Sequence, residues 1–299
     1  MLKKRRRLFQ KTIAAGLALL LLASAFMIRA GATSAWPRGE IPHRVHSWYE
    51  NIPVRVQNGD KRVTDCYLIN ETTYAPLRSL CDAVLPAAKI DFNAKTRTAR
   101  VSADGLYLTA QEGSHYIVAN GRYLYSDTPV LILDDGRTYI PIRSLAKALG
   151  VGIEWNAATR SVTVTGSYAP ILSGDKFYDA DAVYWLSRII SAESQGEPLL
   201  GQIAVGNVVL NRVKNRDFPN TIWGVIFDRR FGVQFTPVAN GTVHREPYYL
   251  SVIAAKLCLE GVTVSEKILY FMNPDISTSF WIPSNRPYAF RIGTHQFYY

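Results

Sequence analysis

Residues 186–213 read Leu-Ser-Arg-Ile-Ile-Ser-Ala-Glu-Ser-Gln-Gly-Glu-Pro-Leu-Leu-Gly-Gln-Ile-Ala-Val-Gly-Asn-Val-Val-Leu-Asn-Arg-Val, and they decide the fold of the second half of the chain. The apolar side chains first recur at helical spacing, and one carboxylate continues their stripe: Leu186, Ile189, Ile190 and Glu193 fall at i, i+3, i+4 and i+7. The polar and small residues 194–196 end this helix, and Asp179 or Asp181 can cap its start. The pattern predicts a helix with a single carboxylate at the end of its buried face.

The second half of that stretch is apolar on nearly every side. A helix of this kind is buried, so we predict that residues 198–214 form the central helix of an α-rich domain. Its polar exceptions, Asn207, Asn211 and Arg212, are either satisfied core groups or groups that face a cleft. Two further helices are predicted downstream, one from Asn220 to Phe227 and one from Pro247 to near Gly261.

Glu193 is the candidate for acid–base chemistry. A carboxyl group on an apolar stripe is partly desolvated, and desolvation raises its pKa. A raised pKa suits a general acid at neutral pH. The alternative is that Glu193 is paired with Arg188 or Arg212 for structure, and the helical pattern alone leaves both interpretations open.

Upstream of the helices, the chain contains a repeat. Thr-Tyr-Ala-Pro-Leu-Arg-Ser-Leu at 73–80 matches Thr-Tyr-Ile-Pro-Ile-Arg-Ser-Leu at 138–145, and Ile-Asp-Phe-Asn-Ala-Lys-Thr-Arg at 90–97 matches Ile-Glu-Trp-Asn-Ala-Ala-Thr-Arg at 153–160. Two ordered matches mark a duplicated unit. Each copy predicts a strand, a helix that begins at Pro76 or Pro141, and two short strands joined by a turn.

The repeat resembles the copper amine oxidase N-terminal-like domain, a small α+β module, over residues 50–166. No copper chemistry is expected, because His115 is the only histidine in this stretch. The resemblance implies a wall-contact module, a self-association module, a stalk or a plain spacer. Cys66 and Cys81 form either one disulfide or two buried thiols, with Cys258 left over.

The first 35 residues have the three-part pattern of an export signal. Basic side chains precede an apolar run at 13–28, and small residues follow it. We therefore expect the bulk of the chain to lie outside the cytoplasmic membrane, with residues 1–35 as a cleaved signal peptide or a membrane anchor. This segment holds seven basic side chains and no acidic one, so only +3 of the +10 net charge belongs to residues 36–299. That weak excess argues against a nucleic-acid partner.

Composition and turn signals set the domain boundaries. With 48% apolar and 19% charged residues, the chain can form a core and is not globally disordered. Residues 166–174 are rich in turn-forming residues. We predict the signal or anchor at 1–35, the duplicated module at 36–166, a linker at 167–177 and a catalytic domain at 178–299.

The second half of the chain resembles the cell-wall hydrolase family of spore cortex-lytic enzymes, of the SleB/CwlJ type. The resemblance covers about residues 178–299 and rests on several ordered motifs: Ser-Ala-Glu-Ser-Gln-Gly-Glu-Pro at 191–198, Gly-Gln-Ile-Ala-Val-Gly-Asn-Val-Val-Leu-Asn-Arg-Val at 201–213, Phe-Pro-Asn-Thr-Ile at 218–222, Gln-Phe-Thr-Pro-Val at 234–238, Leu-Tyr-Phe-Met-Asn-Pro at 269–274 and Ile-Gly-Thr-His-Gln-Phe-Tyr at 292–298. It implies an α-rich, lysozyme-like fold that acts on peptidoglycan glycan strands. The fold class predicted for the whole chain is therefore α+β multidomain.

The resemblance also implies lytic transglycosylase chemistry with Glu193 as the catalytic acid and base. A hydrolase would need a second carboxylate, for which the chain offers Glu197, Asp217, Asp228, Glu246, Glu260, Glu266 and Asp275. Glu197 is better explained as a helix-start residue that interacts with the helix dipole. A non-catalytic wall-binding protein is a further alternative, although a pure binder has no need of a half-buried acid.

Other site assignments are weaker. Gln234 and Thr236 are assigned to substrate positioning, and Tyr270 and Phe271 to sugar stacking or to the core. Glu197 and His295 are included as substrate-site candidates, with a structural histidine as the preferred interpretation of His295. No cofactor or metal is expected, because zinc-ligand spacings and phosphate-binding glycine loops are absent from the sequence. The upstream module replaces the peptidoglycan-binding repeat of many cortex enzymes, so action on vegetative wall is an alternative to action on cortex.

Overall fold

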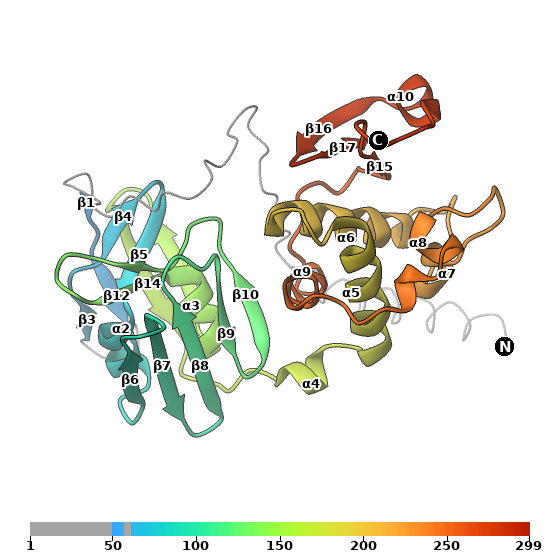
Figure 1. Ribbon diagram of the computed structural model, residues 1–299. Helices are drawn as coiled ribbons and strands as arrows, with labels where there is room; N and C mark the ends of the chain where they lie inside the picture. The colour runs from blue at the N-terminus through green and yellow to red at the C-terminus, as the bar shows by residue number, and fades with distance from the viewer. Residues whose placement is uncertain (1–49, 57–60) are drawn as a thin grey trace, which may run out of the picture.

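The computed structural model describes residues 50–56 and 61–299, which form two lobes joined by a single segment (Figure 1). The predicted export signal at 1–35 lies outside the described residues. Within the described part, no helix is both long and apolar enough to cross a membrane.

The first lobe is built mainly of strands. One sheet has the order β1-β4-β5-β12-β11, a second β10-β9-β8-β7-β6 and a third β13-β14-β2-β3. Their bounds are β1 Glu50–Asn51, β2 Val54–Val56, β3 Arg62–Val63, β4 Tyr67–Ile69, β5 Thr72–Pro76, β6 Lys89–Asn93, β7 Thr98–Ala103, β8 Leu106–Gln111, β9 Tyr116–Ala119, β10 Arg122–Tyr125, β11 Leu131–Ile132, β12 Thr138–Pro141, β13 Gly152–Asn156 and β14 Ser161–Thr165. Two helices, α2 (Leu77–Val84) and α3 (Ile142–Leu149), pack into the shared core.

The two matching sequence segments have the same order of elements. Strand β5, helix α2 and hairpin β6–β7 follow one another in the first, as β12, α3 and β13–β14 do in the second. Antiparallel pairing of β5 with β12 joins them. Pro76 and Pro141 stand one residue earlier than predicted, at the N-cap with extended backbone, because each closes the strand that leads into its helix.

The cysteines of this lobe are two buried thiols and form no disulfide. Both side chains lie in the core. Burial raises the pKa of Cys66 and of Cys81 to about 12, so both stay protonated and unreactive at neutral pH. Cys258, in the second lobe, is also buried and free.

The second lobe is mainly helical. Its helices are α4 Gly174–Phe177, α5 Ala180–Ser194, α6 Leu199–Lys214, α7 Ile222–Ile226, α8 Thr236–Ala239, η1 Thr242–His244, α9 Tyr249–Leu259 and α10 Trp281–Asn285. Asp179 caps α5 by accepting a hydrogen bond from Ala182 N–H at 2.7 Å. Helix α6 is buried along most of its length and packs against α5 and α9, as its apolar sequence predicts.

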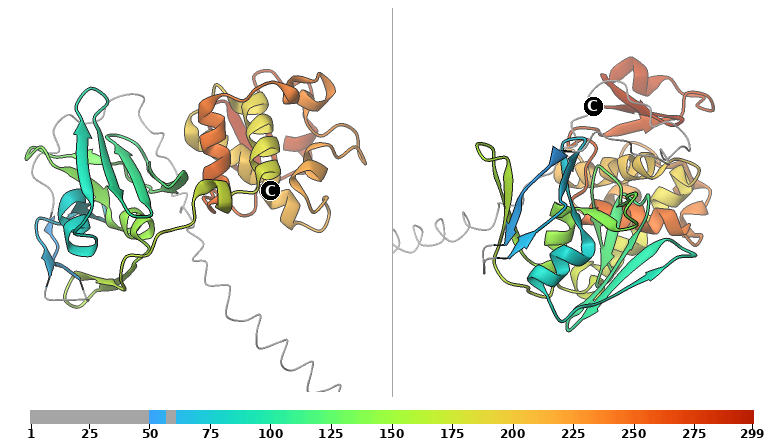
Figure 2. Two further views of the ribbon diagram at one scale, coloured as in Figure 1. Left: turned by 90° about the horizontal axis from the view of Figure 1, so that it is seen from below. Right: turned by 90° about the vertical axis from the view of Figure 1, so that its left-hand side faces the viewer.

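A small antiparallel sheet of order β15-β17-β16 closes the chain. Its strands are β15 Tyr270–Met272, β16 Tyr288–Ile292 and β17 His295–Tyr298. Figure 2 shows this sheet lying over one side of the helices. Asn207 and Asn211 of α6 hold the chain that leads into it, since their amide nitrogens donate to the carbonyl oxygens of Val262, Ser265 and Ile268.

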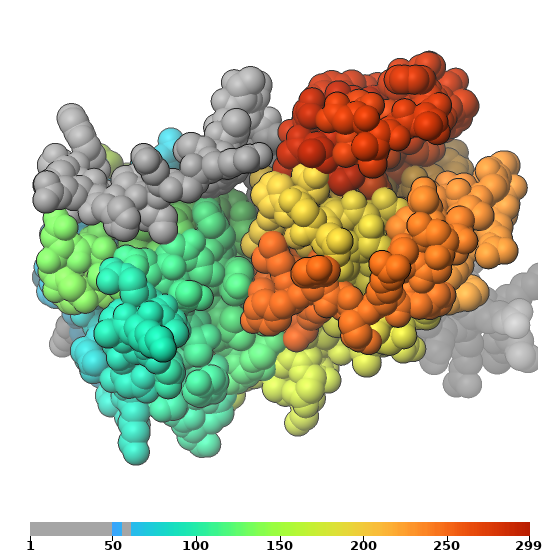
Figure 3. Space-filling model, in the orientation of Figure 1, coloured from blue at the N-terminus to red at the C-terminus, as the bar shows by residue number. Residues whose placement is uncertain are grey.

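The two lobes meet where β10 packs against α9 (Figure 3). At the centre of this contact lies Glu260, whose side chain is 2% exposed. Its carboxylate accepts two hydrogen bonds from Arg122, at 2.7 and 2.8 Å, one from Lys147 at 3.0 Å and one from the Tyr178 hydroxyl at 3.0 Å. The contact is therefore a specific polar cluster, and Tyr123 of β10 extends it into the core of the second lobe.

Candidate active site

Glu193 lies at the last turn of α5, partly buried. Its neighbours in sequence fix this turn, because Ser194 Oγ donates to the Ile190 carbonyl oxygen at 2.7 Å and Ser191 Oγ accepts from Tyr248 N–H at 3.0 Å. Burial raises the pKa of Glu193 to about 7, and the nearby positive charge of Arg212 opposes that rise. The carboxyl group is thus held close to half-protonated at neutral pH.

Arg212, on α6, is the positively charged group that acts on Glu193. It is 5% exposed, and its Nε donates to the Leu269 carbonyl oxygen at 2.8 Å. The guanidinium carbon lies 5.0–5.3 Å from the ring centroids of Phe218, Phe235 and Tyr270, so three aromatic faces surround it. Burial lowers the pKa of Arg212 to about 10, which leaves it charged at neutral pH.

The geometry separates the two interpretations of Glu193. Arg188 pairs with Glu246 at 2.6 Å and stacks on Tyr184, so it is not the partner of Glu193. Among residues 50–56 and 61–299, no ion pair within 4.0 Å joins Glu193 to Arg212, and Arg212 Nη1 is buried without a hydrogen-bond partner. The acid and the cation influence each other's charge without forming a closed structural bridge.

Asp228 is the other carboxylate that acts on Arg212. Its side chain is 5% exposed and accepts hydrogen bonds from Arg230 Nε and Nη2 at 3.0 and 2.8 Å. The Arg230 contact holds the pKa of Asp228 below its usual range. Of the other candidate second acids, Glu260 lies at the lobe contact, Glu246 is bound to Arg188 and Asp275 is paired with Arg291.

Glu197 joins the start of α6 to the turn between β16 and β17. Its carboxylate accepts from the backbone N–H of Thr294 at 3.1 Å and from the Thr294 hydroxyl. Gly293 in this turn has φ +56°, and a Cβ there would overlap the Glu197 carboxylate. His295 Nδ1 lies 3.6 Å from Glu197 Oε1. These contacts are those of a clasp between two parts of the lobe.

The two aromatic candidates, Tyr270 and Phe271, lie in different surroundings. Tyr270 lies beside Arg212, and the Arg286 guanidinium carbon is 4.7 Å from its ring centroid, so the ring stands between two cations. Phe271 instead packs against Phe235, Phe297 and the His295 ring, which is 5.3 Å away. The geometry therefore brings Tyr270 to the Glu193–Arg212 group and Phe271 to the interior.

Gln234 and Thr236 flank Phe235 without a described contact to Glu193. Gln234 Nε2 donates locally to the Gly232 carbonyl oxygen at 3.1 Å, and Thr236 is exposed at the start of α8. Both residues are therefore next in sequence to Phe235, one of the three aromatic rings around Arg212. Sequence reasoning named Asp228 among the candidate second acids, but it did not anticipate that Asp228, Phe218 and Arg286 group around this centre. Only the polar exception at Arg212 on an otherwise apolar helix pointed to it.

Comparison with known proteins gives two family matches. Residues 196–298 match the Cell Wall Hydrolase family, and residues 57–164 match the copper amine oxidase N-terminal domain. Each match covers less than half of the chain. Glu193 lies three residues before the segment that matches the Cell Wall Hydrolase family.

Individual relatives are spore cortex-lytic enzymes. That of Bacillus cereus is 40% identical over 120 residues, which are 40% of this chain and 45% of the relative. That of Bacillus subtilis strain 168 is 40% identical over 112 residues, which are 38% of this chain and 35% of the relative. The chain thus spans less than half the length of these curated relatives.

Two solved structures also match. The catalytic domain of the germination-specific lytic transglycosylase SleB from Bacillus anthracis is 38% identical, with 43% of this chain and all of that chain covered and a TM-score of 0.38. The catalytic domain of the Bacillus cereus SleB protein is 36% identical, with 45% of this chain and all of that chain covered and a TM-score of 0.37.

Proposed function

We propose that this chain, which carries a cell wall hydrolase domain, is a peptidoglycan-cleaving enzyme in which Glu193 is the catalytic acid and base. One observation supports it most directly: burial raises the pKa of Glu193 to about 7 at a helix end that holds no closed ion pair among the described residues. A wall-binding protein without activity would gain nothing from a carboxyl group tuned in this way.

The reaction that fits a single such acid is lytic transglycosylation. Glu193 in its protonated form gives its proton to the oxygen of the bond between N-acetylmuramic acid and N-acetylglucosamine as that bond breaks. The resulting carboxylate then takes the proton of the muramic acid 6-hydroxyl, whose oxygen attacks the anomeric carbon. An anhydro sugar forms, no water is consumed, and Glu193 ends protonated for the next cycle.

Arg212 assists this cycle by electrostatics. Its charge stabilises the Glu193 carboxylate once the proton has left, and the aromatic residues around it keep water away. Without this charge, the Glu193 carboxylate would cost more free energy to form. Protonated Glu193 would then be a weaker acid in the first step. Tyr270, Gln234 and Thr236 are assigned to substrate positioning around this centre, while Glu197 and His295 support it through the clasp.

Hydrolysis is the second candidate, and Asp228 is the observation that favours it. Asp228 is buried, ionised and shares Arg212 with Glu193, as a second carboxylate of a two-acid mechanism would. The products separate the two reactions, because hydrolysis adds water to the new end and transglycosylation does not.

The setting follows the relatives. We assign the chain to the cell wall or spore envelope outside the cytoplasmic membrane, with cortex during germination as the first substrate to test and vegetative wall as the second. We keep residues 36–166 as a duplicated module for wall contact or self-association, 167–177 as a linker and 178–299 as the lysozyme-like catalytic domain.

Digestion of purified cortex and vegetative peptidoglycan by the full chain, with Glu193→Gln as the matched control, tests the proposal. We expect anhydro-muramic ends from the parent chain and at least a hundredfold slower release from Glu193→Gln, read by mass spectrometry. Products one water heavier would replace transglycosylation by hydrolysis. Equal release by parent and variant would remove Glu193 from the mechanism.

A further inference from the structure

A row of rings and cations leads from the candidate active site to the surface of the second lobe. Arg212, which acts on Glu193, has its guanidinium carbon 5.3 Å from the ring centroid of Tyr270. A second guanidinium carbon, that of Arg286, lies 4.7 Å from the same centroid. Arg286 also lies 5.2 Å from the ring centroid of Trp281, whose residue is 52% exposed. The row therefore connects the candidate active site to an open tryptophan ring.

Arg286 is a cation with unused hydrogen-bond donors. Within the described chain, its guanidinium has no ion pair and its Nε is buried without a hydrogen-bond partner. Asp275, a carboxylate on the same segment, is paired with Arg291 at 3.7 Å. The two neighbouring rings stabilise the positive charge through their π faces, but they leave the N–H groups of Arg286 without an oxygen acceptor. An unpaired buried donor is costly, so a ligand with an acceptor oxygen would be favoured here.

The local fold holds this pair of side chains in place. Trp281 begins the short helix α10, and Arg286 follows its last residue. The backbone N–H of Arg286 donates to the Ile282 carbonyl oxygen at 2.9 Å, and Asn285 Nδ2 donates to the Trp281 carbonyl oxygen at 2.8 Å. Helix α10 packs against β15, which carries Tyr270, and Figure 1 shows it beside the small sheet. A ligand would therefore meet side chains that are positioned before it arrives.

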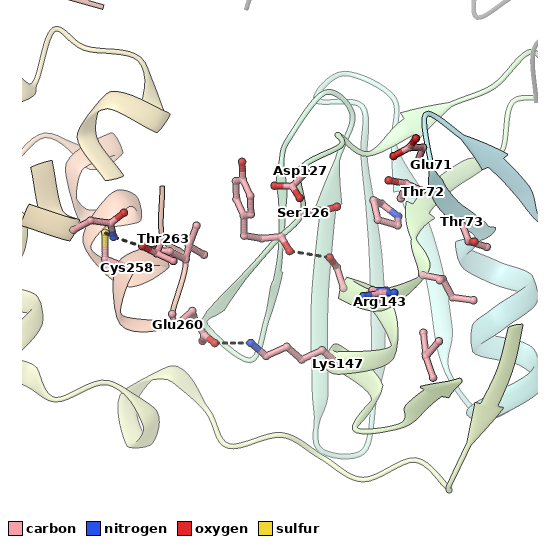
Figure 4. A pocket seen from close by; sticks show the side chains of 18 of the residues that line it. Glu71, Thr72, Thr73, Ser126, Asp127, Arg143, Lys147, Cys258, Glu260 and Thr263 are labelled. Carbon is pink, nitrogen blue, oxygen red and sulfur yellow. Dashed lines mark hydrogen bonds and ion pairs between the residues drawn. The ribbon is translucent and has the colours of Figure 1, made fainter. Parts of the chain in front are cut away.

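The pair is separate from the cavity that lies between the two lobes. That cavity has a volume of about 960 Å³, and Figure 4 shows it from close by. Neither Trp281 nor Arg286 lines it. It has an exposed tryptophan and an exposed cation of its own, Trp155 and Lys214. These two residues provide a matched comparison for any ligand that an open ring and a cation could bind.

The chemistry of the pair suits an N-acetylated sugar. An open tryptophan ring offers a flat apolar surface, and the C–H face of a pyranose can pack on it. The acetamido group of such a sugar adds a carbonyl oxygen that accepts hydrogen bonds from a guanidinium, and bonds to a charged donor are stronger than neutral ones. A neutral acceptor is sufficient, because Tyr270 and Trp281 already stabilise the charge of Arg286.

We propose that Trp281 and Arg286 bind one N-acetylated sugar of the glycan strand, with the sugar face on the Trp281 ring and the acetamido oxygen on the Arg286 guanidinium. The proposal rests on the proposed function, since the sugar belongs to the polymer that is cut at Glu193. Because Tyr270 contacts both Arg286 and Arg212, a sugar held by this pair fixes the position of the strand relative to the candidate active site.

Calorimetric titration of the full chain carrying Glu193→Gln, in which no bond is cut, tests this subsite. One probe is chitotetraose, made of N-acetylglucosamine units, and the other is cellotetraose, which has the same linkage and no acetamido groups. Arg286→Met and Trp281→Ala, each added singly, change the proposed subsite. Lys214→Gln and Trp155→Ala, which remove a cation and a tryptophan from the interlobe cavity, are the matched controls.

We expect chitotetraose to bind about tenfold more tightly than cellotetraose. Arg286→Met should raise the Kd of chitotetraose to about that of cellotetraose, because it removes the donors to the acetamido oxygen. Trp281→Ala should weaken the binding of both probes alike, because both pack a sugar face on the ring. Both controls should keep the Kd values of the Glu193→Gln chain. Circular dichroism melting establishes that each variant folds.

An unchanged preference for chitotetraose in folded Arg286→Met would overturn the proposal, as would binding of neither probe to the folded Glu193→Gln chain. If Arg286→Met does not fold, unaltered binding of both probes by Trp281→Ala overturns it instead. Weaker binding in Lys214→Gln or Trp155→Ala, with the subsite variants unaffected, would place the sugar in the interlobe cavity and also overturn it. Because binding is read without cleavage, failure of this subsite is distinct from failure of Glu193 as the catalytic group.

Discussion

At the scale of single residues, the candidate site consists of a buried acid, Glu193, and a cation, Arg212, that three aromatic rings surround. Burial raises the pKa of Glu193, and the Arg212 charge limits the rise. The rings of Phe218, Phe235 and Tyr270 surround the cation and exclude the water that would otherwise screen it. Glu193 is thus close to its titration midpoint at neutral pH, which serves a group that must both give and take a proton.

A pH profile follows from this pair. Glu193 must be protonated to start the reaction, so we expect kcat/KM to fall as pH rises above about 7. In Arg212→Met, the charge that lowers the pKa of Glu193 is lost, and the descending limb should move to higher pH. Arg212→Lys, which keeps a positive charge, should restore the limb toward its original position.

Steady-state rates on soluble glycan strands between pH 5 and 9 provide the measurement. A purely structural Arg212 would change the amount of folded enzyme and leave the limb where it is. A limb at the same pH in the parent and in Arg212→Met would therefore rule out the electrostatic role.

At the scale of elements, the ends of helices carry the chemistry and the turns hold them in place. Glu193 lies in the last turn of α5, and Glu197, four residues later, makes the clasp just before α6 begins. The clasp reaches across the lobe to the β16–β17 turn, where only glycine fits at 293. The β16–β17 turn, close to the last residue of the sequence, therefore holds the segment that leads into the central helix α6.

Gly293→Ala should destabilise the second lobe through this clasp. The backbone strain at positive φ costs about 1 kcal/mol, and the overlap with Glu197 adds to it, so we expect a total loss of about 2 kcal/mol or more. Gly241→Ala is the control, because Gly241 also has positive φ but has open space around it. Urea unfolding gives both values, and equal losses would mean that the clasp contributes nothing.

At the scale of the whole molecule, the two lobes meet at the polar cluster around Glu260, beside which Tyr123 packs into the core of the second lobe. Burial alone would raise the pKa of Glu260, but Arg122 and Lys147 together hold it below its usual range. A lowered carboxyl pKa means that the folded state favours the charged form. The stability that Glu260 contributes is therefore present at neutral pH and is lost in acid, as pH falls through the lowered pKa of Glu260.

Glu260→Gln should loosen the contact between the lobes at neutral pH. It removes the same charge that protonation of Glu260 removes from the parent chain in acid. Removing one charge of a buried, hydrogen-bonded cluster costs about 3 kcal/mol, since it leaves Arg122 without its carboxylate partner. Small-angle X-ray scattering at pH 7 checks this through a larger radius of gyration for the variant. Lys61→Gln, an exposed lysine outside the contact, is the control, and identical scattering of parent and Glu260→Gln would contradict the prediction.

Much of the architecture was predictable from local pattern. The bounds of α5, α6 and α7 follow from the apolar stripe, the caps and the breakers around residues 179–227, because helices of this length are specified by their own residues. The helix and hairpin of each matching upstream segment followed from the paired prolines and Asn-Ala turns in the same way. The sequence also pointed to Glu193, because it is the one carboxylate that continues an apolar helical stripe.

Tertiary structure alone decided what those elements bring together. The sequence by itself determined that Glu193 lies at the end of the buried face of one helix and that an arginine lies on the otherwise apolar next helix, since both are statements about spacing along a helix. The enclosure of Arg212 by residues 218, 235 and 270, the clasp of Glu197 with Thr294 and the meeting of Glu260 with Arg122 join positions 6 to 138 residues apart. Such pairings depend on how whole surfaces pack, which no local pattern encodes.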